Sequence, residues 1–172
     1  MTPAPEHTVA QLARQAVEGY VRHGSVLRPE ATTPELRGRA GVFVSLHKGG
    51  ELRGCIGTFE PTRDNVAEEI VANAISSATR DPRFPPVTPS ELPELDYSVD
   101  ILTAPEPVKG PEELDARRYG VIVASDWRRG LLLPDLEGVD TVEQQIQICR
   151  MKAGIGAKEK VRLYRFEVKR YR

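Results

Sequence analysis

The stretch Gly41–Phe59, with the sequence GVFVSLHKGGELRGCIGTF, encodes a β-hairpin around which the rest of the chain is built. Gly41–His47 predicts one strand, Gly49-Gly50 supplies a turn, and Glu51–Phe59 is the returning strand. The returning strand contains two glycines, a cysteine and an arginine, although strands built only for packing prefer β-branched and aromatic residues. Residues that are unfavourable in a strand, when they lie beside a reactive side chain such as a thiol, indicate a functional site.

The register of this hairpin decides which way Cys55 points. With Gly49-Gly50 as a two-residue loop, Cys55 lies opposite Val44 and Arg53 lies opposite Leu46. Cys55 and Arg53 then share the face of Val44. A one-residue change in loop length, or a bulge, would turn the whole set to the other face. The sequence therefore leaves open whether the thiol faces a cleft or the core.

Length and composition place the chain among ordinary globular proteins. Its 172 residues fit one domain over 1–172, and 40% hydrophobic with 28% charged residues is typical of a soluble protein. No apolar run approaches the roughly 18 residues of a membrane helix, and the N-terminus lacks the features of a secretory signal. Two cysteines do not make a disulfide framework. We expect a cytoplasmic protein with reduced thiols and no membrane partner.

Charge is distributed unevenly along the chain. The net charge of −1 argues against a nucleic-acid binder, yet the segment Arg150–Arg172 holds nine basic residues and two acidic ones. Such a segment could contact an acidic partner or a phosphate backbone. The alternative is an edge strand whose Lys and Arg side chains discourage edge-to-edge pairing. We favour the edge strand, so nucleic acid is not an expected partner.

Periodicity predicts the remaining elements. A capping box at Thr8–Gln11 opens a helix, and a hairpin at 120–133 repeats the pattern of the first, with Gly41 and Gly120 79 residues apart. Helices are predicted over 9–22, 63–80 and 142–153, a helical turn at 88–91, and strands at 95–101 and 161–171. The expected fold class is α+β, a two-lobed single domain of antiparallel hairpins covered by helices, with an internal duplication as a further prediction.

Cys55 carries the chemical hypothesis. A thiol reacts or binds metal as the thiolate, and a nearby cation lowers its pKa. Arg53, two residues away in a strand, projects on the same face, while Gly54 and Gly57 would admit a substrate. His47 is the nearest histidine and a candidate base. One Cys and one His fall short of the ligands that zinc requires, so no metal site is assigned and no cofactor is identified.

Two other regions carry candidate residues. The segment 81–86 contains Asp81, Arg83 and Phe84 among three prolines, and either stops a helix or lines a cleft together with Thr58. Cys149 lies on the inward face of a predicted helix, where a buried structural thiol is expected.

These motifs resemble the AMMECR domain family, whose bacterial and archaeal members are also called AmmeMemoRadiSam system protein A. The resemblance covers about residues 8–170 and rests on four motifs: Leu52–Gly57, Asp81–Pro86, Gly130–Pro134 and Cys149–Gly154. It implies an α+β fold of two related lobes with the first motif at a cleft. It also implies genetic association with a Memo-type protein and a radical enzyme, and this chain lacks the three-Cys motif of such an enzyme. His47 is outside the family pattern.

The leading hypothesis is a thiol-dependent enzyme or accessory factor with Cys55 as nucleophile or ligand and Arg53 stabilising the thiolate or binding an anion. A second hypothesis is a non-catalytic module that binds protein or nucleic acid through Arg150–Arg172. A third keeps Cys55 buried and assigns Gly54 and Gly57 to close packing.

Overall fold

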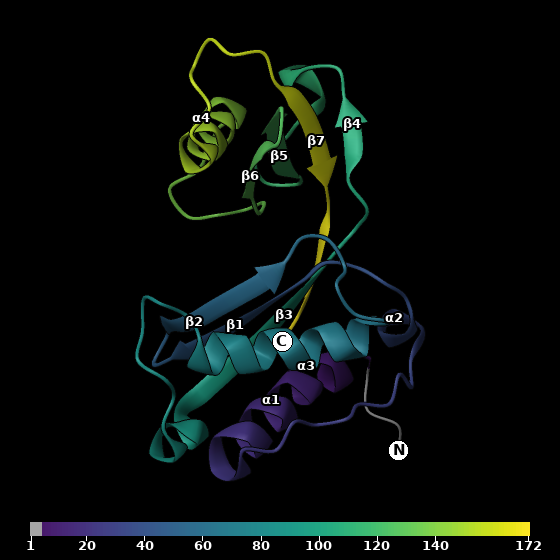
Figure 1. Cartoon of the computed structure of the whole chain (residues 1–172), viewed down its shortest axis with the longest axis vertical. Coiled ribbons are helices and arrows are strands. Elements are labelled where there is room, and N and C mark those ends of the chain that lie inside the picture. Colours follow the sequence, from purple (N-terminus) through teal and green to yellow (C-terminus); the bar gives the residue numbers. More distant parts are fainter. Residues whose placement is uncertain (1–4) are drawn as a thin grey trace. The chain divides into compact units, whose positions relative to one another are not determined.

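The computed structural model describes residues 5–172 and consists of helices and antiparallel sheets (Figure 1). The chain divides into two compact units. Unit 1 comprises the described residues up to Leu102 together with Lys169–Arg172, and unit 2 comprises Thr103–Val168. The predicted α+β class with two lobes is confirmed. Among the described residues, no helix combines the length and the apolar character that a bilayer crossing requires.

Unit 1 is a four-stranded sheet covered by helices. The sheet order is β2-β1-β3-β8, and α3 packs against β1 and β2 while α1 packs against α3 and β3 (Figure 1). Its elements are α1 (Pro5–His23), α2 (Pro34–Arg37), β1 (Val42–Lys48), β2 (Glu51–Thr58), α3 (Val66–Thr79), the 3-10 helix η1 (Pro89–Glu94), β3 (Leu95–Leu102) and most of β8 (Val168–Tyr171).

The ends of the helices follow local chemistry. Asn65 caps α3 by accepting a hydrogen bond from the Glu68 amide, as predicted, and the helix stops just before Asp81 and Pro82. The capping box predicted at Thr8 is wrong, because α1 begins at Pro5 and Thr8 already lies inside the helix. Proline fits the first turn of a helix, which explains the earlier start.

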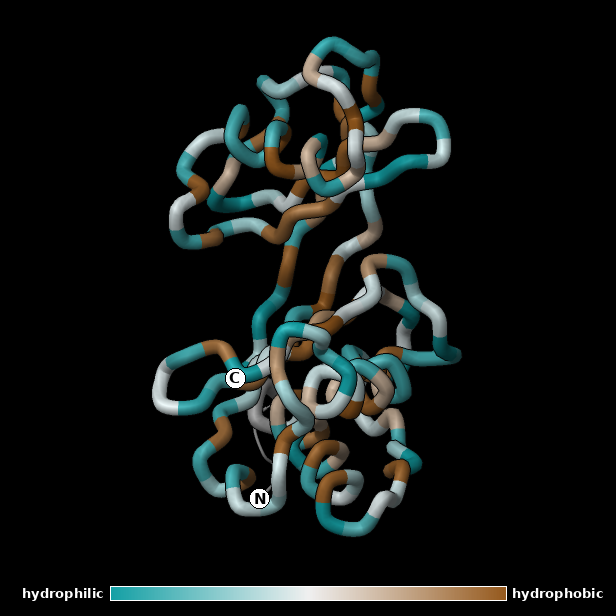
Figure 2. The backbone as a smooth tube through the Cα atoms, turned by 60° about the vertical axis from the view of Figure 1, so that its left-hand side comes forward, coloured by the Kyte–Doolittle hydropathy of each residue, from teal (hydrophilic) through white to brown (hydrophobic). Residues whose placement is uncertain are grey.

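The core of unit 1 lies between the helices and one face of the sheet. Alternate strand residues point into it, among them Val44 in β1, Val99 in β3 and Tyr171 in β8, all buried. The predicted apolar stripe of α3, Val66 with its neighbours one turn apart, is also buried there. Hydrophobic and hydrophilic residues alternate along the helical coils (Figure 2). Ser45, Ser98 and other intervening strand residues are left on the outer face of the sheet.

Unit 2 is built in the same manner on a smaller scale. Its sheet order is β4-β7-β5-β6, and α4 packs on β5 and β6. Its core includes Val121, Val123, Cys149 and Ile155. The elements are β4 (Glu106–Val108), the 3-10 helix η2 (Pro111–Glu113), β5 (Gly120–Ser125), β6 (Arg128–Leu132), α4 (Val142–Ala153) and β7 (Arg162–Phe166).

Two strand predictions differ from the structure. The predicted strand 161–171 is two strands, β7 and β8, in different sheets. At Glu167 the backbone leaves the strand ladder and bonds to Thr103 instead. The Glu167 amide donates to the Thr103 hydroxyl, and the Glu167 carbonyl oxygen accepts from the Thr103 amide. Strand β4 was not predicted because Pro107 suggested a connection, yet an edge strand tolerates proline.

The two hairpins share one topology. Each hairpin is followed by a helix and then by a strand that returns to pair with the first strand, giving β2-β1-β3 in unit 1 and β6-β5-β7 in unit 2. The internal duplication suggested by the sequence repeat stays a prediction.

Candidate functional site

A bulge sets the direction of Cys55. Lys48 pairs with Glu51, so Gly49-Gly50 is the predicted two-residue turn, and both glycines adopt the positive φ that it requires. The register then shifts by one residue, leaving Arg53 as the extra residue of β2. Cys55 consequently lies opposite Ser45. The sequence left the face of Cys55 open, and the structure has the alternative with a bulge, which turns Cys55 from the face of Val44 to the outer face.

Cys55 belongs to a row of small polar side chains across the outer face. Ser45 pairs with Cys55 on one side and with Ser98 of β3 on the other. The Cys55 Sγ and the Ser45 Oγ are 3.2 Å apart. The thiol is partly exposed, in contrast to the buried Cys149. The sheet therefore presents a thiol and two hydroxyls side by side outside the core.

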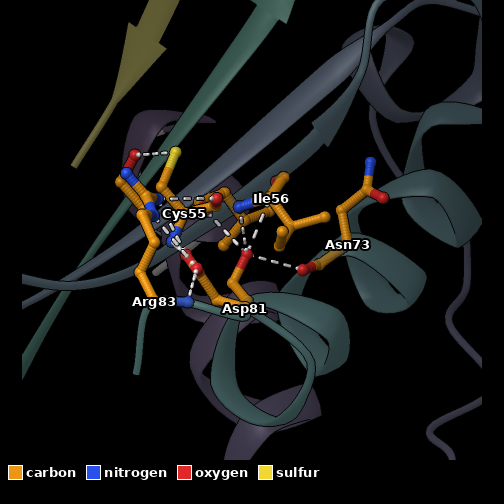
Figure 3. Close-up of polar contacts among 8 residues, drawn as sticks. Cys55, Ile56, Asn73, Asp81 and Arg83 are labelled. Atoms are coloured by element: carbon orange, nitrogen blue, oxygen red, sulfur yellow. Dashed lines mark hydrogen bonds and ion pairs between the residues drawn. The ribbon is translucent and has the colours of Figure 1, made fainter. Parts of the chain in front are cut away.

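Asp81 lies just after α3 and joins the end of that helix to β2, the strand that carries Cys55. Its carboxylate is 2% exposed, and Oδ2 accepts a hydrogen bond from the Cys55 amide at 3.0 Å. The same carboxylate accepts bonds from the Arg83 amide and Nε, both at 3.0 Å to Oδ1, and from Arg83 Nη2 at 2.8 Å to Oδ2. Figure 3 shows the side chains of Asp81 and Arg83 beside Cys55. The bonds from Arg83 and then from the Cys55 amide hold the pKa of Asp81 well below its usual range.

Arg83 places an exposed guanidinium beside the thiol. Its side chain is 56% exposed, and Nη2 also donates to the Cys55 carbonyl oxygen at 3.3 Å. The guanidinium lies 5.5 Å from the centre of the Phe84 ring. The ion pair with Asp81 raises the pKa of Arg83. The segment 81–86, predicted either to stop a helix or to line a cleft, thus ends α3 and also contributes a charged group next to Cys55.

The environment of Cys55 favours the protonated thiol. Burial raises its pKa above the ordinary value, while the hydrogen bond with Ser45 and the charge of Arg83 lower it by less. The carboxylates of Asp100 and Asp81 raise it further. The hypothesis gave Arg53 the role of stabilising a thiolate or binding an anion. The cation next to Cys55 is instead Arg83, whose Nη2 bonds to the Cys55 carbonyl oxygen.

Arg53 has a different partner because the bulge directs it away from Cys55. Its Nε donates to Glu91 Oε1 at 2.9 Å and its Nη2 donates to Oε2 at 3.3 Å, while Lys48 Nζ lies 3.3 Å from the same carboxylate. Arg53 is 12% exposed and Glu91 is 15% exposed. The bond with Arg53 is the main reason that the pKa of Glu91 falls to about 2. This pair joins β2 to η1.

Gly54 and Gly57 admit neighbouring parts of the chain. A Cβ on Gly54 would lie 2.1 Å from the Ser77 carbonyl oxygen, and one on Gly57 would lie 2.3 Å from the Phe43 ring. Two roles were considered for these glycines, room for a substrate and close packing of the chain itself. The structure supports close packing: Gly54 lets α3 approach the strand, and Gly57 lies against the Phe43 ring.

Buried polar side chains of α3 bind the hairpin. The Ser77 hydroxyl donates to the Val44 carbonyl oxygen at 2.7 Å and accepts from the Ile56 amide at 2.9 Å. Asn73, on the other side of Ile56 from Cys55 in Figure 3, donates to the Val42 carbonyl oxygen at 2.9 Å. These bonds fix the helix on the strand pair, and they were not predicted because the helix pattern shows only which positions face inward.

Thr58, a predicted lining residue, serves the same attachment. Its hydroxyl donates to the buried carboxylate of Glu69 and accepts from Asn73. Glu69 also accepts hydrogen bonds from the amides of Thr62 and Arg63, which orders the connection between β2 and α3. Thr58 therefore has a structural partner on the core side of the sheet.

A second Asp–Arg pair lies on the outer face. Asp100 is 3% exposed and accepts two hydrogen bonds from Arg170 of β8, at 2.7 Å from Nε and 2.9 Å from Nη2. The alternation of β3 already placed Asp100 on the polar face. Its partner could not be predicted, because 70 residues separate the two.

The other candidates lie outside this cluster. Cys149 is fully buried in unit 2, as predicted. His47 lies on the outer face of β1 and pairs with Leu52 and Asp96, whereas the hydrogen-bond partner of the thiol is Ser45. Within the part of the chain that the structure describes, no three His, Cys, Asp or Glu side chains gather to hold a metal ion.

Much of the basic segment is used within the chain. Arg150 donates to the Gly156 carbonyl oxygen, Lys152 to that of Leu131, and Arg162 to that of Asp126. Further basic side chains pair with carboxylates, as in Arg165 with Glu106 and Arg170 with Asp100. The carboxylate pairs offset part of the positive charge of the segment, and the bonds to carbonyl oxygens occupy donors that a nucleic acid would need.

The chain matches a known family and several relatives. The family model AMMECR1 matches residues 10–171. A protein of Thermotoga maritima is 55% identical over 171 residues, covering 97% of this chain and 98% of that protein. A Clostridium acetobutylicum protein, CA_C1420, is 47% identical over 94% of this chain, which corresponds to 35% of that longer protein.

A solved structure shares the fold. The crystal structure of the uncharacterized protein PH0010 from Pyrococcus horikoshii superposes with a TM-score of 0.86 at 34% identity. The match covers 96% of this chain and 89% of the other.

Proposed function

The chain belongs to the AMMECR1 family, and on this premise we propose that it is a thiol-dependent enzyme or accessory factor whose ligand contacts Cys55. One observation supports this above the others. A single buried carboxylate, Asp81, fixes both the backbone of Cys55 and the exposed guanidinium of Arg83. Removing a carboxylate from water is costly, and here it orients a thiol and a cation on an outer face. Such preorganisation is typical of sites that bind a ligand.

The protonation state of Cys55 determines what the site can do alone. At neutral pH the raised pKa keeps the thiol protonated, so it can donate a hydrogen bond but is a weak nucleophile. Its partner, the Ser45 hydroxyl, is not a base at this pH. Binding therefore comes first, and a reaction at sulfur requires a base brought by the ligand or a partner protein. This favours the accessory role, with the Memo-type protein and radical enzyme implied by the family resemblance as candidate partners.

Disulfide exchange with a panel of small disulfide-capped fragments tests this proposal. The Cys149→Ser variant leaves Cys55 as the single thiol, and Cys55→Ser is the matched control. We expect intact mass spectrometry to show that Cys55 captures a subset of fragments well above the rest, because neighbouring groups select them. Uniform capture, or none in the folded protein, would contradict a ligand site at Cys55.

A further inference from the structure

We propose that the ligand of the Cys55 site carries a carboxylate or phosphate group and that Arg83 binds it. This inference rests on the proposed function, which it deepens by naming the class of ligand. Arginine presents several N–H donors in a fixed fork that matches both groups. Arg83 Nη2 donates to the Cys55 carbonyl oxygen, so the fork lies next to the residue that carries the thiol.

The hydrogen bonds of Arg83 leave part of the guanidinium for a ligand. Asp81 takes Nε and one proton of Nη2, and the Cys55 carbonyl oxygen takes the other. Within the described residues, Nη1 donates no hydrogen bond. The Arg83 side chain as a whole is 56% exposed.

The guanidinium is held in place before any ligand arrives. An isolated surface ion pair contributes little, because two long side chains must lose their freedom. The Arg83 side chain instead makes two hydrogen bonds to a carboxylate that is itself 2% exposed, and the Arg83 amide makes a third. An anion binding to Arg83 therefore meets a cation that has already lost most of its rotamer freedom.

The surroundings of the thiol also suit such a ligand. Ser45 and Ser98 provide hydroxyl groups along the row that begins at Cys55, and the half-buried Phe43 ring lies over Gly57 in the next row. A molecule with its anionic group on Arg83 would place its remaining atoms over this row. The carboxylates of Asp81 and Asp100 are buried and paired, so the exposed parts of both Asp–Arg pairs are their cationic ends.

The competing explanation is that Arg83 only fastens the segment 81–86 to β2. The two roles predict different behaviour toward a charged and a neutral reagent of nearly equal size. Iodoacetate is an anion and iodoacetamide is neutral, and both alkylate a thiolate. A change in fold or in thiol exposure alters both rates together. A bound-anion site changes their ratio.

The experiment measures the rate constants of both reagents at Cys55 in the Cys149→Ser protein. We expect the iodoacetate-to-iodoacetamide ratio to exceed that of a free cysteine peptide in the same buffer, and to fall about 5-fold in Arg83→Gln. Arg170→Gln is the matched control, since it removes an equally charged arginine that is bound to a different carboxylate, Asp100 of β3, two strands from β2 in the sheet order. It should change the ratio less than 2-fold.

Protection distinguishes the two anion sources without any substitution. Inorganic phosphate and acetate are added separately during alkylation by iodoacetamide. Slowing by phosphate alone points to a phosphate ligand, and slowing by acetate alone points to a carboxylate; either result supports the proposal. A wild-type ratio no higher than that of the peptide, with no protection by either ion, overturns it even if Arg83→Gln fails to fold. Alkylation without charge preference contradicts this inference alone, whereas non-selective fragment capture contradicts the proposed function.

Discussion

The two hairpin-helix regions of this protein have the same topology and different chemistry. In each, a glycine of the second strand lies against the helix backbone: Gly54 against the Ser77 carbonyl oxygen and Gly130 against that of Cys149. In the residue that follows, the regions diverge. Cys55 lies opposite Ser45, whereas Leu131 lies opposite Ile122.

The helices differ in the same way. The inward face of α3 includes Glu69, Asn73 and Ser77, which bind the hairpin through hydrogen bonds. The corresponding helix α4 buries Gln145 and Cys149, and the latter lies in an apolar cluster. The shared topology therefore provides a scaffold in both units, and the polar residues of unit 1 give that unit a candidate site.

The close approach of helix and strand should be the most sensitive feature of both regions. Gly54→Ala and Gly130→Ala would each force a Cβ to within about 2 Å of a carbonyl oxygen, so each should lower the free energy of unfolding by about 3 kcal/mol. Urea unfolding monitored by circular dichroism measures the loss. Gly38→Ala is the control, because open space surrounds that position. If only one of the two substitutions is destabilising, the packing equivalence of the regions fails.

Removing the carboxylate of Asp81 should damage unit 1 through a feature that unit 2 lacks. Asp81→Asn takes a buried acceptor away from Cys55 and Arg83, with an expected loss of about 2–3 kcal/mol. Because folding lowers the pKa of Asp81, its contribution is present above its ordinary value of 3.8 and is lost as pH falls below it. Unfolding free energies measured from pH 7 downward should show a shallower acid dependence in the variant. An unchanged slope would contradict this role.

The Arg53–Glu91 pair should stabilise the hairpin without influencing the thiol. Glu91→Gln should lower the unfolding free energy at pH 7 by about 2 kcal/mol, because the pair is mostly buried. Since the pKa of Glu91 is lowered from 4.5 to about 2, the wild-type advantage should disappear as pH falls through this window. The alkylation rate of Cys55 should stay within 2-fold of wild type. A larger change in that rate would mean that Arg53 does influence the Cys55 thiol and would contradict this prediction.

The buried thiol of Cys149 in unit 2 should lower the free energy of unfolding at alkaline pH. Burial raises the pKa of Cys149 from 9.0 to about 11, so folding favours the protonated form and stability declines as pH rises from 9 to 11. The loss should be about 1 kcal/mol at pH 10, measured in a Cys55→Ser background. The same protein carrying Cys149→Ala should lack this component of the decline. Identical alkaline profiles would mean that the thiol titrates normally.

The sequence was sufficient for the main elements and insufficient for the site geometry. Gly49-Gly50 correctly predicted a two-residue turn, and the inward stripe of α3 was correct, because both depend on local chemistry. The strand glycines were compatible with either a bulge or a close approach of another group, so the sequence did not decide that a bulge lies at Arg53. That one residue reversed the face of Cys55 and gave Arg53 another partner.

Long-range contacts account for the other differences. Arg83 was named as a candidate, but its position beside Cys55 depends on the buried carboxylate of Asp81 reaching back to β2. The pairing of Asp100 with Arg170 depends on how β8 joins the sheet. The split of the predicted strand 161–171 depends on Thr103. Periodicity reports which face a residue occupies and carries no information about such partners.

The central claim is that equivalent scaffolds hold one thiol on an outer face, in unit 1, and another in a core, in unit 2. The most direct test is the rate at which iodoacetamide modifies Cys55 and Cys149 in the folded protein, followed by peptide mass spectrometry. Cys55 should react at least about 100-fold faster, because Cys149 must wait for an opening of unit 2, even though both thiols have a raised pKa. Equal rates for the two cysteines would contradict the account.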